Sequence, residues 1–272
     1  MTAEFVRYPF FLAGSAGPLF AMHYKPARHL RRPESLLFVP PFAEEMNRSR
    51  RVVALQAEAL AAIGLGVLVL DLFGCGDSGG DFGEATWEQW LDDVSIAAAW
   101  LEQESQSAVG LWGLRLGASL AALAASRSAD RFSRLLLWSP VARGQVFLTQ
   151  FLRARVAMAL SVPGVERETT ATLRQFFARG EPVEVAGYTV NAPLAAAIDA
   201  IDLSVLTPKC RSSVHWLDIV PNSSATASDD ASQVIAAWRQ AGCQVSQHVE
   251  TAPRFWNLVE TTIAPQLVEA TT

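Results

Sequence analysis

Cysteine and histidine are scarce in this chain of 272 residues, which contains three cysteines and four histidines. The cysteines, Cys75, Cys210 and Cys243, form no C-x-x-C pair. A sparse, odd number of cysteines favours a reducing compartment over a disulfide scaffold, so we expect a cytoplasmic protein. The histidines lack metal-ligand spacing, which argues against a zinc site. We expect no metal and no cofactor.

Charged residues are few, and long apolar runs are absent from the sequence. Only 18% of the residues are charged and the formal net charge is -5, which gives no reason to expect nucleic acid or an anionic membrane surface as a partner. No apolar run reaches the roughly 18 residues of a membrane span. The apolar beginning of the chain lacks a basic start and is interrupted by Gly14, Gly17 and Pro18, so we expect no signal peptide.

What is present is an alternation of apolar runs with amphipathic segments. The patterns predict a β-hairpin at 4–24 and strands at 35–41, 65–74, 108–113, 133–141, 212–220 and 243–250, with helices at 50–64, 86–105, 118–128, 227–242 and 255–270. Continuous apolar strands that alternate with helices indicate an α/β fold with a mostly parallel sheet and helices on both faces. The alternation stops over 145–207, which we interpret as a helical lid insertion within a single domain, 1–272.

A tight turn between the strand at 108–113 and the helix at 118–128 carries the most informative motif. The stretch "GLWGLRLGAS" (110–119) has the outline of the nucleophile elbow G-x-S-x-G, with Gly113 and Gly117 in register. Arg115 occupies the place of the nucleophile. Because the turn follows two earlier strand-helix units, its position along the chain is that of the elbow of an α/β-hydrolase. A turn that needs two glycines only for packing is the alternative.

The whole chain resembles an α/β-hydrolase and, more narrowly, the exosortase A system-associated hydrolase 2 family of bacteria. The stretches that carry the resemblance include "PPFAEEMNRSRR" (40–51), "DLFGCGDSGGDFG" (71–83), "WGLRLGA" (112–118) and "PRFWN" (253–257), together with "LLLWSPV" and "VEVAGYTV". The resemblance implies an α/β-hydrolase fold and a setting in exopolysaccharide production and protein sorting. It also implies that the arginine at the elbow is a shared feature, not an isolated lesion.

Two members of a Ser-His-Asp triad are missing from their expected positions. A guanidinium is not a nucleophile, and Ser119 lies one turn along the helix, away from the elbow. No histidine follows the last predicted strand, where the base belongs, and His248 falls within that strand. Asp218 stands near the position of the acid but has no base to orient. Cys75, in a glycine-rich loop, has no basic neighbour in sequence to activate it.

Part of an oxyanion hole survives in the sequence. The backbone N–H of Leu116 follows the elbow residue, and the N–H of Phe42 replaces one that Pro41 lacks. Arg115 sits at a helix N-terminus, where a cation is disfavoured by about 0.3–1 kcal/mol. We therefore expect a compensating anion, which is either Glu44 or Glu45 from the adjacent loop or a bound carboxylate, phosphate or sulfate.

Two classes of function lead, and a third, a protein that only assembles with neighbours in an export pathway, stays open. A noncatalytic protein would bind a small anionic or acyl ligand with Phe42, Glu44, Glu45, Arg115 and Leu116, and Trp256 of "PRFWN" would serve either the ligand or the core. An unconventional hydrolase or acyl transferase would act on an ester or thioester with a carboxylate or water in place of the triad. The missing nucleophile and base favour the first, as a pseudoenzyme. The sequence leaves the substrate and the oligomeric state open.

Overall fold

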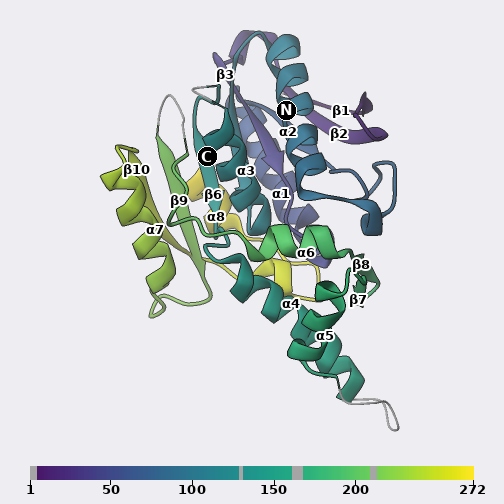
Figure 1. Ribbon diagram of the computed structural model, residues 1–272. Helices are drawn as coiled ribbons and strands as arrows, with labels where there is room; N and C mark the ends of the chain where they lie inside the picture. Colours follow the sequence, from purple (N-terminus) through teal and green to yellow (C-terminus); the bar gives the residue numbers. More distant parts are fainter. Residues whose placement is uncertain (1–4, 129–130, 161–167, 209–212) are drawn as a thin grey trace.

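The computed structural model describes residues 5–128, 131–160, 168–208 and 213–272. Within them one sheet of eight strands has the order β1-β2-β4-β3-β5-β6-β9-β10 (Figure 1). The six strands in the order β4-β3-β5-β6-β9-β10 run parallel to one another. At one edge β1 and β2 form an antiparallel hairpin, and β2 also pairs antiparallel with β4. The strands are β1 (Phe5–Ala13), β2 (Pro18–Pro26), β3 (Glu34–Val39), β4 (Gly66–Leu70), β5 (Ala108–Leu114), β6 (Leu135–Trp138), β9 (Val214–Val220) and β10 (Val245–Thr251).

Helices cover both faces of this sheet. Helices α1 (Glu44–Ala62) and α8 (Pro265–Thr271) pack on one face, and α2 (Trp87–Ser105), α3 (Leu116–Arg127) and α7 (Asp229–Gln240) pack on the other (Figure 1). Successive strand residues point to opposite faces, so Leu111 joins one buried cluster and Trp112 the other. The prediction of an α/β-hydrolase fold, with a mostly parallel sheet between two helical layers, is confirmed.

The insertion between β6 and β9 lies at the carboxyl ends of the parallel strands (Figure 1). It contains α4 (Gly144–Leu160), α5 (Thr170–Ala178) and α6 (Ala192–Asp199), with a hairpin of β7 (Val183–Val185) and β8 (Tyr188–Val190). Ala186 and Gly187 both have positive φ angles, which suits the two-residue turn of that hairpin. The sequence pattern predicts only a break between helices here and does not predict the hairpin. Residues 161–167 of the predicted insertion lie outside the described residues.

Two helices differ from their predicted bounds by more than two residues at one end. Helix α1 begins at Glu44, not at 50, so Glu44 and Glu45 belong to its first turn and not to a loop. Acidic residues are favoured there because they face the positive end of the helix dipole. The closing helix predicted at 255–270 is wrong. A 3-10 turn, η3 (Phe255–Asn257), is followed by irregular chain, and α8 begins only at Pro265, which fits the first turn of a helix but not its interior.

The other short 3-10 segments are η1 (Arg28–Leu30) and η2 (Phe82–Glu84). Across the described part of the chain, no helix combines the length and the apolar character that crossing a membrane requires. Cys75 and Cys243 are free thiols, and Cys210 falls outside the described residues.

Candidate functional site

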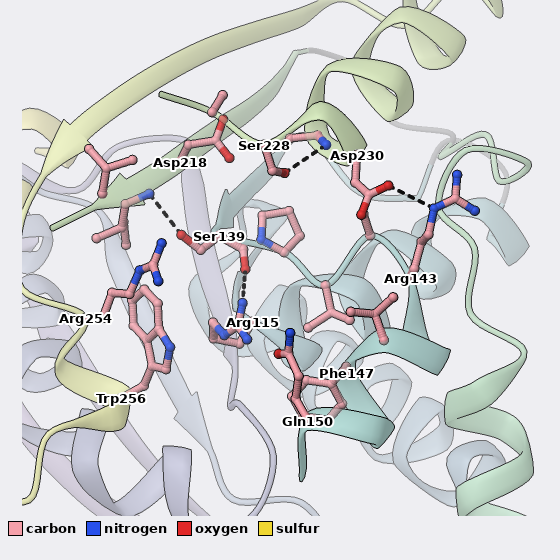
Figure 2. A pocket seen from close by; sticks show the side chains of 18 of the residues that line it. Arg115, Ser139, Arg143, Phe147, Gln150, Asp218, Ser228, Asp230, Arg254 and Trp256 are labelled. Carbon is pink, nitrogen blue, oxygen red and sulfur yellow. Dashed lines mark hydrogen bonds and ion pairs between the residues drawn. The ribbon is translucent and has the colours of Figure 1, made fainter. Parts of the chain in front are cut away.

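A cleft of about 360 Å³ opens at the carboxyl ends of the parallel strands (Figure 2). Its walls come from the ends of β5, β6 and β9, the start of α4, the segment that leads into α7, and the segment after β10. We call it the central cleft and define it by Arg115, Gln150, Asp218, Arg254 and Trp256, which all line it. Open α/β sheets bind ligands at this edge, where the loops after neighbouring strands converge.

The turn between β5 and α3 has the backbone of an elbow. Arg115 adopts φ 55° and ψ −122°, a strained conformation for a residue with a side chain. Its N–H donates to the carbonyl of Trp138, 2.9 Å away, which ties the bend to β6. A Cβ on Gly113 would lie 2.4 Å from Cα of Ala118, and one on Gly117 would lie 2.2 Å from the carbonyl oxygen of Pro40. Both glycines are therefore required where the sequence motif places them.

The Arg115 side chain is held loosely. Its Nε lies 3.4 Å from Oε1 of Glu45, and its Nη1 lies 3.4 Å from the carbonyl oxygen of Ser139. Its Cζ sits 5.4 Å from the centroid of the Trp256 ring, within reach of a cation–π contact. The two 3.4 Å contacts to Glu45 and Ser139 are long, because N–H···O hydrogen bonds are normally 2.7–3.2 Å long. In the same cleft Arg143 makes shorter contacts, 2.9 Å to Asp230 and 3.1 Å to Asp202. The Arg115 guanidinium thus retains donors for a further partner.

Of the two acidic candidates, Glu45 contacts Arg115 and Glu44 does not. Glu44 points outward, where it accepts a hydrogen bond from Tyr188 and forms an ion pair with Arg48. Oε2 of Glu45 is buried and has no hydrogen-bond partner among the described residues. Burial raises the pKa of the Glu45 carboxyl, and the charge of Arg115 offsets only part of that rise. Both the Arg115 guanidinium and the Glu45 carboxylate therefore keep hydrogen-bonding capacity that the other does not satisfy.

Neither Phe42 nor Leu116 is among the described residues that line the central cleft. No described residue accepts a hydrogen bond from either backbone N–H, as a surviving oxyanion hole would require. Their side chains instead line a small apolar void behind the cleft. The ring of Phe42 packs edge-to-face against Phe147 and Phe151 of α4, with centroids 5.8 and 5.1 Å away.

The histidines and the candidate nucleophiles Ser119 and Cys75 lie outside the lining of the central cleft. None of the four histidines lines it: His248 is exposed on the edge strand β10, stacked 6.5 Å from His215. Ser119 is buried and donates to the carbonyl of Val141. Cys75 is also unsuited to catalysis because burial raises the pKa of its thiol. No group of three or more histidine, cysteine, aspartate or glutamate residues in the described ranges could hold a metal ion.

Asp218 does line the cleft, but neutral donors hold it. Nε1 of Trp216 donates to one carboxylate oxygen at 3.0 Å and Nε2 of Gln247 donates to the other at 2.9 Å. The residue lies within β9, not after it. Trp256 and Phe255 are buried, at 3% and 1% exposure, so the aromatic pair of "PRFWN" belongs to the core, although one edge of Trp256 reaches the cleft.

Three residues of the cleft were missed from sequence. Ser139 has a positive φ of 42° after β6, and its hydroxyl accepts a hydrogen bond from the N–H of Ile219. Arg254 is exposed and lines the cleft, and its guanidinium has no hydrogen-bond or ion-pair partner among the described residues (Figure 2). Gln150 enters from α4. Arg254 lies in the "PRFWN" stretch and could have been predicted from it, whereas nothing in the local sequence marks Ser139 or Gln150.

Comparisons with solved structures agree with this architecture. Est1E from Butyrivibrio proteoclasticus, in a structure with ferulic acid bound, superposes with a TM-score of 0.64 at 16% identity, covering 96% of each chain. An α/β serine hydrolase homologue from Coxiella burnetii gives 0.55 at 16% identity over 97% of this chain and 93% of that one. XC6422 from Xanthomonas campestris, a serine hydrolase without lid, gives 0.57 at 15% identity over 97% and 90%.

At these identities the likeness concerns the fold alone. No curated protein matches the sequence. The profile of the serine aminopeptidase S33 family, however, matches residues 32–183, which is more than half of the chain and includes the elbow. The chain therefore belongs to the serine aminopeptidase S33 family of α/β-hydrolases.

Proposed function

We propose that this protein binds a small anionic ligand in the central cleft and does not carry out Ser-His-Asp hydrolysis. The observation that carries the proposal is the Arg115 guanidinium, which stands at the elbow with contacts no shorter than 3.4 Å to Glu45 and Ser139. A carboxylate, sulfate or phosphate would accept the remaining donors in the bidentate geometry that arginine favours. The insertion at 145–207 would act as the roof over the ligand.

The resemblance to the exosortase A system-associated family supports a setting for this binding. We infer a bacterial cytoplasmic protein that works beside exopolysaccharide production and protein sorting, as a ligand-responsive pseudoenzyme. The absence of a histidine along the cleft, among the described residues, supports the same inference, because an acyl transfer of the usual kind needs a base within hydrogen-bond reach.

Anion binding is tested by calorimetric titration with acetate, sulfate and phosphate at pH 7. We expect Arg115→Met to weaken the binding of the anion that the wild type prefers by about ten-fold or more, because one charge-assisted pair is lost. The matched control is Arg179→Met, which removes the same charge from an exposed pair with Glu181 outside the cleft. Equal affinities in the wild type and in both variants would contradict the proposal.

The Arg115→Ser variant separates this proposal from unconventional hydrolysis. We expect a panel of short acyl esters and thioesters to be inert with the wild type and to stay inert with Arg115→Ser. The variant places a hydroxyl at the elbow but has no histidine to take its proton. Turnover by the wild type that disappears in Glu45→Gln would instead establish catalysis by the buried carboxylate.

A further inference from the structure

The charges that line the central cleft are not all matched. Arg143 is satisfied by Asp202 and Asp230, and Arg115 is loosely paired with Glu45 behind the wall. This leaves one cation and one anion on the wall, Arg254 and Asp218, with no opposite charge within ion-pair distance among the described residues. A cleft with one unpaired cation and one unpaired anion suits a ligand that carries both an anionic group and a hydrogen-bond donor or cation.

The anionic side of the cleft is available for a donor. Each oxygen of Asp218 accepts a single hydrogen bond, from Trp216 or from Gln247, whereas a carboxylate has sites for about four. Both of these donors are neutral, so no cation in the part of the chain that the structure describes competes with a ligand for this carboxylate. The side chain is half-buried, which strengthens a hydrogen bond to its charge relative to one in open water.

The cationic side is formed by two guanidinium groups from different segments. Arg115 comes from the elbow, and Arg254 comes from the segment after β10, two residues before the Trp256 ring on which Arg115 rests. Figure 2 shows both side chains at the cleft, with Asp218 reaching it from β9. The cleft volume of about 360 Å³ falls within the range of small-molecule sites.

We infer that the ligand is a dipolar small molecule, a carboxylic acid that also carries an ammonium or hydroxyl group several bonds away. Its acid group lies at Arg115 and Arg254, and its donor lies at Asp218. This inference rests on the proposed anion binding and goes beyond it by naming the class of ligand. The polar side chains of Gln150 and Thr226, which line the same cleft, supply further partners between the two ends.

The test compares matched acids that differ only at the far end. Butyrate, 4-hydroxybutyrate and 4-aminobutyrate, with their five- and six-carbon homologues, are titrated by calorimetry at pH 7. At one chain length we expect the hydroxy or the amino acid to bind about ten-fold more tightly than the plain alkanoate, the effect of one hydrogen bond to a charged group. Whichever of the two, the hydroxy acid or the amino acid, binds more tightly than the alkanoate identifies the hydrogen-bond donor of the ligand. Asp218→Asn should abolish that advantage and leave alkanoate binding within about two-fold.

A second variant keeps the test informative if Asp218→Asn fails to fold. Arg254→Gln changes an exposed side chain and should weaken all three acids alike, whereas Arg179→Gln, outside the cleft, should weaken none. Acids that bind in an Arg115-dependent way with no gain from the far-end donor would overturn the dipolar ligand and leave anion binding intact. No binding of any acid, plain or substituted, would overturn both.

Discussion

Replacing Gly117 by alanine is expected to destabilise the protein by about 3 kcal/mol, since an added methyl group has nowhere to go. Its Cβ would lie 2.2 Å from the carbonyl oxygen of Pro40 and 2.4 Å from that of Val39. Both neighbours are backbone atoms at the end of β3, so a rotamer change cannot relieve the clash. The measurement is urea unfolding followed by tryptophan fluorescence, with the midpoint and slope fitted separately.

The matched control for this substitution is Gly17→Ala. Gly17 has no positive φ, and the nearest atom to its added Cβ, on Phe73, is 3.6 Å away, which is ordinary contact. We expect a change of less than about 0.5 kcal/mol there. If Gly117→Ala were as stable as Gly17→Ala, helix α3 would not pack against the end of β3 at its first turn, and the elbow geometry would be wrong.

Arg115→Met is expected to lower stability by about 2 kcal/mol at pH 7. The side chains of Arg115 and Glu45 are 21% and 17% exposed, so the pair lies between a surface ion pair, worth less than about 1 kcal/mol, and a fully buried one. Methionine fills a similar volume but removes the ion-pair partner of the Glu45 carboxylate. Adding Glu45→Gln should restore most of the loss, because the second change removes the unpaired charge.

The pH dependence gives an independent check on the same pair. The pKa of Glu45 is raised in the folded wild type, chiefly by burial, and loss of the Arg115 charge raises it further. A folded state that holds a proton more tightly than the unfolded state gains stability as pH falls through that raised pKa. The deficit of Arg115→Met should therefore shrink from pH 7 toward pH 4. A deficit that is constant with pH, or a double variant no more stable than the single one, would show that Glu45 is not the partner.

The sheet and most helices were predictable because their signals are local. Apolar runs such as 108–113 and the N-capping Thr86, whose side chain accepts from the N–H of Gln89, carry their structure in a few adjacent residues. The prediction of the closing helix was wrong because the helical spacing of apolar residues was followed across Pro265, where a helix can begin but cannot continue. The β7-β8 hairpin was not predicted because each strand has only three residues. That is too short for the alternation of apolar and polar residues to stand out between helical segments.

The site was predictable only in part. The elbow could be located because glycine spacing reports backbone geometry, and Arg115 was identified with it. The sequence could not tell whether Glu44 or Glu45 turns inward. That depends on the direction of the first turn of α1, which follows Ala43 with its φ of 52°. Arg254 and Asp218 come from segments that are far apart along the chain. That neither has an opposite charge beside it among the described residues results from how those segments pack, which the local sequence does not reveal.

The rings of Phe42, Phe147 and Phe151 tie the insertion to the segment that leads into α1. Lifting α4 away would separate two edge-to-face pairs, worth roughly 1–3 kcal/mol together before any loss of apolar burial. The insertion is therefore packed directly against the segment that precedes the first turn of α1, which carries Glu45. Any displacement of α4 would therefore disturb the ring contacts of Phe42, which lies just ahead of α1, so the part of the cleft wall that α4 forms and the Arg115–Glu45 pair share a common support.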